Sequence, residues 1–199
     1  MVDGNPWLTQ APAEAEQPEA VSRALKGPQG PVAPHDGVPA PDTADRLQRR
    51  EVQWPASMWW LGAHGGAGET TLASLSPGTR AADHAWPIPV RGGLSRVMVV
   101  ARSNYSGLLA AQRAAIEWAS NTLSPDLQVM GLVLIPDAPG KRPKEIEQLE
   151  RVVAGGFPRL FKMPWVEEWR FAAATSTKLP ASYQILLSDL NLYTNNPRY

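Results

Sequence analysis

The residues whose types and spacing best suit chemistry lie in one glycine-rich stretch, which reads His64-Gly65-Gly66-Ala67-Gly68-Glu69-Thr70-Thr71. A strand-like apolar run precedes the stretch and helix-forming residues follow it, which is the element order of phosphate-binding loops. Glycines allow consecutive backbone amides to curl around phosphate oxygens, and the following helix presents its positive end to the same anion. The stretch therefore predicts a loop that can bind an anion through Gly65, Gly66 and Gly68, with Thr70 and Thr71 beside it.

The negative charge of Glu69 is unfavourable for phosphate binding. A complete phosphate-binding loop has a lysine at this position, just before the hydroxyl residue. Two unit charges about 4 Å apart interact by about 4 kcal/mol at an effective dielectric constant of about 20, so a glutamate here strongly weakens nucleotide binding. Two orientations fit the sequence: the Glu69 carboxylate takes the place of the anion in its own loop, or it points into solvent. Both predict no nucleotide turnover, and Glu69→Lys is expected to restore phosphate binding.

The same loop resembles the deviant Walker A loop of the MinD and ParA class of partitioning ATPases, which reads Lys-Gly-Gly-x-Gly-Lys-Thr-Thr. His64 and Glu69 replace the two lysines, whereas the three glycines and both threonines are present. The resemblance implies that Thr70 is the magnesium-binding hydroxyl and that the apolar runs near 96–102 and 131–137 are late strands of that fold. The loop is also similar to that of an uncharacterised bacterial family with a GAHGGAGxTT loop, which often accompanies conjugative or integrative elements.

The spacing after the loop departs from the partitioning ATPases. Only about twenty residues separate Leu75 from Arg96, where that class places two further strands and both switch regions. Asp137 follows an apolar run and is a candidate Walker B acid, although by chain order the resemblance places it where the nucleotide base is recognised. These departures predict a non-catalytic binding or adaptor module derived from a P-loop protein, in a DNA-transfer or partition apparatus.

Two other interpretations stay open. In the first, the chain is a nucleotide-binding ATPase-like or GTPase-like switch that takes its missing cation from Arg91, Arg96, Arg102 or a partner subunit. In the second, the glycines only form a tight turn in an unrelated structural domain. No cofactor is expected under the leading interpretation, and ATP with magnesium is the alternative. A protein partner is expected, and a homodimer is compatible with the sequence.

Other chemistry finds little support in the composition. The chain has no cysteine, which excludes disulfides, thiolate zinc sites and cysteine nucleophiles. His64, Asp83 and His84 offer metal-ligating side chains but neither an i, i+4 pair nor a fourth ligand, so no metal site is predicted. With 19 basic and 19 acidic residues, no extended nucleic-acid surface is evident. No apolar run is long enough to span a membrane, so a cytoplasmic location is expected.

Apolar runs and helical periodicity predict an α/β domain. Strands are expected at 58–61, 97–101 and 129–135, with a weaker one at 160–163, and helices at 105–121 and 143–154. Strands that alternate with helices form crossover units, so we expect a small three-layer, P-loop-like domain with a mainly parallel sheet of four to five strands.

Composition also predicts the limits of this domain. Residues 1–50 contain eight prolines and one aromatic residue, which predicts a disordered tail that can be deleted without loss of stability. The tail acts as a tether or as a proline-rich docking peptide. The α/β domain is expected over 54–175 and a C-terminal helical extension over 176–199. Seven of the eight tryptophans follow residue 50, and Trp165 and Trp169 would share one face if they lay on a helix.

Overall fold

Four apolar segments form adjacent strands of a parallel sheet, as the sequence predicts. The structure is a computed structural model that describes residues 30–192. Its strands are β1 (Gln48–Val52), β2 (Met58–Gly62), β3 (Thr79–Ala81), β4 (Ala85–Pro89), β5 (Ser95–Arg102), β6 (Leu127–Ile135) and β7 (Leu160–Lys162). Its helices are α1 (Glu69–Ser74), α2 (Tyr105–Ala119), α3 (Lys144–Ala154) and α4 (Ala181–Asp189), with short 3-10 turns at Thr43–Asp45, Glu167–Arg170 and Ala174–Ser176.

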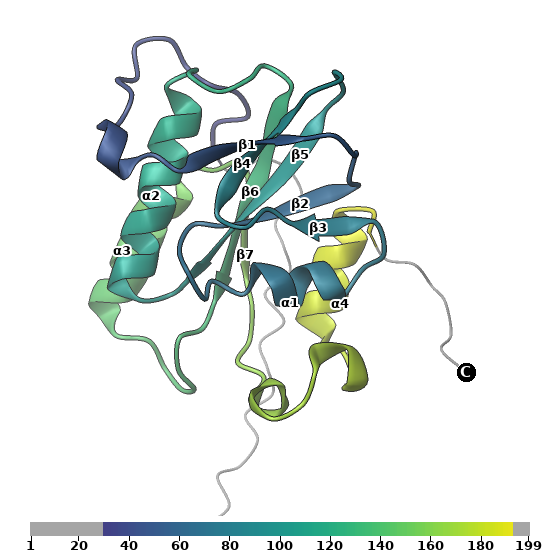
Figure 1. The fold of residues 1–199 in the computed structure, drawn as a ribbon. Helices are drawn as coiled ribbons and strands as arrows, with labels where there is room; N and C mark the ends of the chain where they lie inside the picture. Colours follow the sequence, from purple (N-terminus) through teal and green to yellow (C-terminus); the bar gives the residue numbers. More distant parts are fainter. Residues whose placement is uncertain (1–29, 193–199) are drawn as a thin grey trace, which may run out of the picture.

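The main sheet has five strands in the order β3-β2-β5-β6-β7, and every neighbouring pair is parallel. Helices α2 and α3 cover one face, whereas α1 and α4 cover the other (Figure 1). The predicted α/β class with a mainly parallel sheet is therefore confirmed. The chain runs from β2 to β3 on one side and later continues through β5, β6 and β7 on the other, so the direction of winding reverses next to β2.

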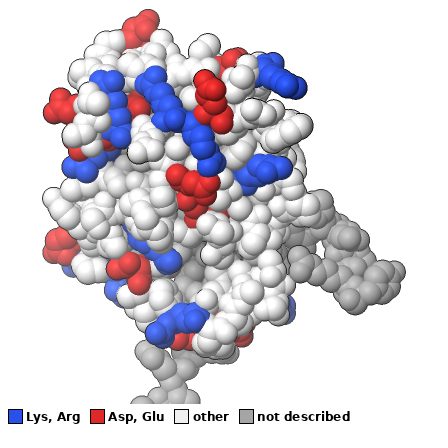
Figure 2. Space-filling model, viewed as in Figure 1, with Lys and Arg blue, Asp and Glu red and all other residues white. Residues whose placement is uncertain are grey.

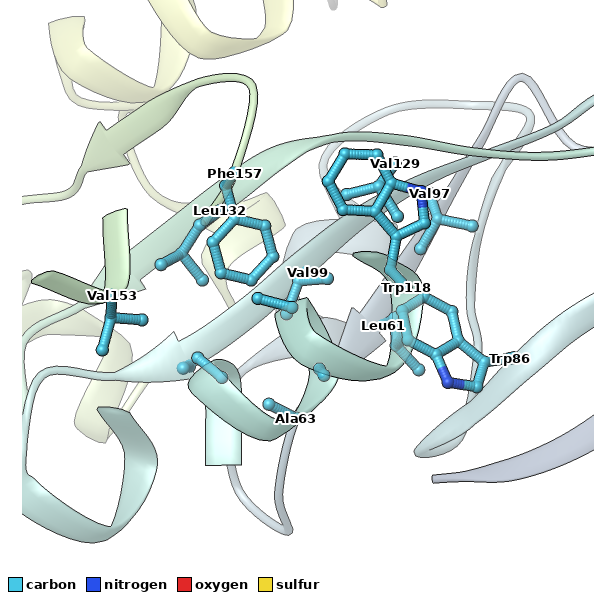
Figure 3. Packing of buried hydrophobic residues seen from close by; sticks show 14 of the residues in the cluster. Leu61, Ala63, Trp86, Val97, Val99, Trp118, Val129, Leu132, Val153 and Phe157 are labelled. Carbon is cyan, nitrogen blue, oxygen red and sulfur yellow. The ribbon is translucent and has the colours of Figure 1, made fainter. Parts of the chain in front are cut away.

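Alternating side chains of the central strands build a core on each face. Trp59 packs on the α2 and α3 face and Trp60 on the α1 and α4 face, as expected for adjacent residues of one strand. Figure 3 shows the first core, in which Trp118 and Phe157 lie among side chains of the central strands. Both faces are thus closed by buried apolar contacts, and the edges of the sheet are left for polar groups.

The predicted limit of the tail at residue 50 is wrong. Residues 30–50 belong to the described part of the chain, and β1 pairs in parallel with β4 in a second, two-stranded sheet. The backbone N–H of Leu47 donates to Oε2 of buried Glu117 on α2 at 3.0 Å. This segment is therefore held by backbone pairing, by one buried carboxylate and by a few apolar side chains, Leu47 and Val52 among them, that pack on the core. Residues 1–29 of the predicted tail lie outside the described residues.

Helix α4 lies within the predicted C-terminal extension and buries Tyr183, Leu186 and Leu187 against the sheet. Within residues 30–192, no helix combines the length and apolar character needed to cross a bilayer. Figure 2 shows Lys and Arg side chains interspersed with Asp and Glu side chains on the face in view. That face therefore carries a mixed distribution of charge.

Candidate functional site

The candidate site lies at the carboxyl edge of the main sheet, where β2 and β5 end side by side. Helix α1 follows β2 on one face and α2 follows β5 on the opposite face (Figure 1). In open α/β sheets a crevice forms where consecutive connections leave on opposite faces, and ligands bind there. The glycine loop, residues 63–68, is the turn at this crevice.

The glycine loop has the backbone freedom that the sequence predicts. Gly66 and Gly68 have positive φ angles of 75° and 103°, which favour glycine, and Gly68 is the residue before α1. A Cβ atom added to Gly65 or Gly66 would meet no atom within 4 Å, so this part of the loop borders open space. Thr70, on the first turn of α1, is exposed. The loop is accessible, but α1 is only six residues long.

Glu69 is turned into the protein, with 5% of its surface exposed. Its Oε2 accepts a hydrogen bond from the backbone N–H of Gly62, and its Oε1 lies 3.2 Å from Nδ1 of His84. The predicted solvent orientation is therefore wrong. The carboxylate does turn inward, but its backbone donor is Gly62 at the end of β2 and not one of the loop glycines, so the prediction that it takes the place of a phosphate stays a prediction.

Gly62 and His84 make room for this carboxylate and hold it. A Cβ atom at Gly62 would lie 2.9 Å from Glu69 Oε2 and 2.8 Å from His84 Nδ1. Nδ1 of His84 also lies 3.1 Å from the carbonyl oxygen of Gly62, so this nitrogen faces two acceptors and carries a proton. The sequence analysis named His84 only as a weak metal-ligand candidate; in the structure it is the partner of Glu69.

His64 connects the glycine loop to the end of β5. Its Nε2 accepts from the backbone N–H of Arg102 at 3.0 Å, and its Nδ1 contacts the carbonyl oxygen of Gly65 at 2.9 Å. An imidazole that accepts at Nε2 and donates at Nδ1 is neutral. His64 therefore acts as a link across the crevice, and its position is unlike that of a lysine that reaches toward phosphate.

Arg102, the last residue of β5, places a positive charge beside the glycine loop at the carboxyl edge of the sheet. Its Nε donates to the carbonyl oxygen of Gly66 at 3.0 Å, and its Nη1 donates to that of Pro136 at 2.8 Å. Among residues 30–192, no carboxylate lies within 4.0 Å of its guanidinium. Of the three arginines considered from sequence, Arg102 lies at the loop, whereas Arg91 borders a hollow beside Ser95, at the opposite end of β5.

A polar hollow of about 460 Å³ opens in front of the loop. Its lining includes the loop residues His64, Gly65 and Gly66, together with Arg102, Asn104 and the exposed Asp137. Asn104 caps α2, because its side chain accepts from the N–H of Gly107 at 2.8 Å. The structure thus brings Asp137 to the same hollow as two of the predicted glycines.

A second hollow of about 280 Å³ lies on the other side of Arg102, and we call it the strap pocket. It is covered by the strap, residues 163–180 between β7 and α4. Gly68 and Thr71 border it from the loop side, and Trp165, Trp169 and Tyr183 border it from the strap and α4. Thr70 borders neither hollow, so the predicted loop residues are divided between two spaces.

The strap pocket is the part of the site that the sequence analysis missed. Trp165 precedes a 3-10 turn that contains Trp169, so the two do not share an α-helix, yet both border the pocket. Trp169 packs against Tyr183, with ring centroids 4.7 Å apart, and its Nε1 donates to Thr177 at 2.8 Å. Burial raises the pKa of Tyr183, and the positive charge of Arg102 opposes this shift. The high tryptophan content was the available signal.

No group of three or more metal-ligating residues occurs in the described part of the chain. No curated protein and no solved structure matches the chain significantly. One family model matches residues 56–187, a range that begins after β1 and contains both hollows. Because this range covers more than half of the chain, the protein belongs to the family of unknown function DUF6668.

Proposed function

We propose that the protein is a non-catalytic binding module derived from a P-loop protein. The observation that carries this proposal is the inward position of Glu69, whose carboxylate is held by Gly62 and His84. A phosphate-clamping loop needs a cation at this position, whereas here the side chain is an anion that is held inside the protein and cannot contact a phosphate favourably.

The loop also lacks the other parts of nucleotide chemistry. Hydrolysis requires a residue that positions the attacking water and a carboxylate that holds magnesium. Asp137 is exposed on the rim of the polar hollow, and no hydrogen bond to its side chain holds it in place among residues 30–192. The glycine loop therefore serves to shape the edge of the sheet, where Arg102 and the strap supply the contacts to a ligand or a protein partner.

The test is phosphate release from Mg-ATP and Mg-GTP by the full chain. The expected result is a rate equal to that of buffer, for the natural protein and for Thr70→Ala alike. Turnover by the natural protein that disappears in Thr70→Ala would contradict the proposal, because only a working loop uses that hydroxyl. Co-purification from native cells tests whether the protein has a partner, either a component of a DNA-transfer or partition apparatus or a second copy of the chain.

A second candidate function is a nucleotide-dependent switch in which Arg102 replaces the loop lysine. Arg102 favours it, because its side chain reaches the carbonyl of Gly66 and carries a charge that no carboxylate neutralises among the described residues. Calorimetric titration with Mg-ATP separates the two candidates. Binding that is lost in Arg102→Gln would support the switch, and absence of binding supports the non-catalytic module.

A further inference from the structure

We propose that the strap pocket binds a small aromatic anion, that is, one or two fused rings that carry a carboxylate or a sulfonate. This inference deepens the proposed function and rests on it, because it names the ligand class of a module that does not turn over nucleotide. Three features of the pocket support it: an arginine without an ionic partner, a tyrosine hydroxyl at the pocket wall with no hydrogen bond among the described residues, and aromatic walls.

Arg102 supplies the positive charge. Its two hydrogen bonds, to Gly66 and Pro136, use two of the five N–H donors of a guanidinium. Arg170 also borders the pocket, but its Nη1 lies 2.7 Å from Oε1 of Glu167, so its charge is already compensated. A half-buried arginine that keeps free donors and lacks a carboxylate is suited to one external anion.

Tyr183 supplies the second polar group. The residue is 1% exposed and borders the pocket, and its hydroxyl takes part in no hydrogen bond among the described residues. The hydroxyl is not among the fully enclosed unpaired atoms of the described residues, so its oxygen reaches the pocket and can donate to a group bound there. Arg102 and Tyr183 line the same pocket, so an anion bound to Arg102 there can accept a hydrogen bond from this hydroxyl.

The walls and the size of the pocket define the rest of the ligand. Trp165 and Trp169 offer aromatic faces, and Leu72 and Ile135 add apolar surface. Flat apolar rings pack well against such side chains. The volume of about 280 Å³ lies just below the usual range for small-molecule sites, roughly 300–1,000 Å³, which suits one or two rings better than a complete nucleotide.

The test is calorimetric titration of the full chain with 2-naphthoate and with its neutral analogue 2-naphthamide. The naphthoate is expected to bind at least about tenfold more tightly, because a hydrogen-bonded charge contributes on this scale. N-acetyl-tryptophan and its amide form a second pair, which shows whether the same chemistry at the C-terminus of a peptide is also accepted. Equal binding of acid and amide, or no binding of any probe, overturns the inference.

Variants locate the binding. Tyr183→Phe and Arg102→Gln are each expected to weaken naphthoate binding by about tenfold or more, and Arg102→Lys should restore part of the loss. The matched controls are Tyr105→Phe, an exposed tyrosine, and Arg170→Gln, whose charge is paired; both should bind as the natural protein does. Because Tyr183→Phe leaves every described hydrogen bond intact, it keeps the test valid if Arg102→Gln misfolds. Binding unaffected by Tyr183→Phe overturns the inference.

Competition with Mg-ATP separates this inference from the proposed function. Displacement of naphthoate by Mg-ATP at similar concentration would identify the pocket as part of a nucleotide site and overturn the inference. Absence of naphthoate binding together with absence of phosphate release overturns the inference alone. Phosphate release that depends on Thr70 overturns the proposed function, whatever the naphthoate result.

Discussion

The two faces of the main sheet differ in how their buried polar groups are paired. On the α2 and α3 face, Oε2 of Glu117 accepts from the N–H of Leu47 and from Nε1 of Trp86 at 2.9 Å. Glu150, also fully buried, contacts Lys162 Nζ at 2.6 Å. Each carboxylate joins segments that are distant in the sequence. The second oxygen of each carboxylate has no hydrogen bond among the described residues, but it lies near an arginine: Arg49 at 4.0 Å from Glu117 and Arg142 at 3.2 Å from Glu150. On this face each buried carboxylate is therefore held by contacts within the protein.

The α1 and α4 face leaves polar groups free beside an open pocket. Arg102 has no carboxylate partner and Tyr183 has no hydrogen bond, in both cases among residues 30–192. Glu69 combines features of both groups. It is buried and paired like the carboxylates of the first face, but it lies on α1, next to the glycine loop. From this comparison we expect the polar groups on the first face to contribute mainly to stability, and those on the second face to contribute little to it.

The largest effect expected from this comparison comes from deletion of residues 1–52. The deletion removes the β1–β4 pairing and the donor that Leu47 gives to Glu117. It also removes Pro31 and Val38, which border a hollow over α2 and α3. We expect the midpoint of thermal unfolding to fall by about 10 °C or more, since about 1 kcal/mol corresponds to 2–4 °C in a protein of this size.

Differential scanning calorimetry measures this change, and deletion of residues 1–29 is the matched control. That shorter deletion retains every described element and is expected to leave the midpoint unchanged. An unchanged midpoint after removal of 1–52 would break the comparison, because the first face would then be stable without the segment that its buried carboxylate holds.

The next effect is expected from Glu117→Ala. This change leaves the N–H of Leu47 and the indole N–H of Trp86 without an acceptor, and each buried unpaired donor costs about 1–3 kcal/mol. We expect the free energy of unfolding to fall by about 3 kcal/mol, and by less in Glu117→Gln, which keeps one acceptor oxygen. Urea denaturation measures the change. Glu145→Ala, at an exposed position on α3, is the control and should change stability by less than about 0.5 kcal/mol.

How far the fold follows from sequence depends on the apolar content of each element. Strands β2, β5, β6 and β7 are apolar runs, and they were predicted within two residues of their observed ends. Strands β1, β3 and β4 were not predicted, because β1 has a single apolar residue, β3 has three residues, and β4 contains two prolines. Pairing partners rather than local pattern determine such short strands.

The site was predictable to the extent that glycine spacing reports backbone shape. The loop and its position between a strand and a helix follow from Gly65, Gly66 and Gly68. The direction of the Glu69 side chain could not be predicted, because its partner His84 reaches it only through the turn after β3. The strap pocket could not be predicted either, because its walls come from five separate parts of the chain.

A smaller effect is expected from Glu69→Ala, which tests the intermediate position of this residue. The change leaves the N–H of Gly62 without its acceptor and Nδ1 of His84 without the carboxylate oxygen 3.2 Å away, so we expect a loss of about 2 kcal/mol in urea denaturation. Glu69→Gln should lose about half as much. A variant as stable as the natural protein would show that the contact between the carboxylate and Gly62 does not stabilise the fold. Glu69 would then resemble Arg102 and Tyr183, whose polar groups are not needed for stability.

The related variant Glu69→Lys tests the expected restoration of phosphate binding. A lysine cannot accept from Gly62, and its charge disfavours the position beside His84, so its side chain is expected to turn toward the open side of the loop. Titration with pyrophosphate should then show binding that the natural protein lacks. A folded variant without such binding would indicate that the loop amides do not form an anion site.

The smallest effect on stability at neutral pH is expected from Tyr183→Phe. This variant is also the most direct test of the difference between the two faces of the sheet. The hydroxyl has no described hydrogen bond to lose, so stability at pH 7 should change by less than about 0.5 kcal/mol. Burial raises the pKa of Tyr183 above its ordinary value of 10.0. Above about pH 10 the unfolded chain therefore loses this proton while the folded protein keeps it, and the natural protein loses up to about 1.4 kcal/mol of stability per pH unit.

Tyr183→Phe has no such proton to lose, so its stability should fall less steeply than that of the natural protein between pH 10 and pH 11. Urea denaturation across this interval measures the difference in slope, and Tyr105→Phe, whose ring is exposed in both states, should keep the natural slope. A large loss at pH 7 would mean that the hydroxyl supports the fold like the carboxylate of Glu117. Equal slopes for the natural protein and Tyr183→Phe would mean that water reaches the phenol in the folded state, because only a buried hydroxyl holds its proton above pH 10.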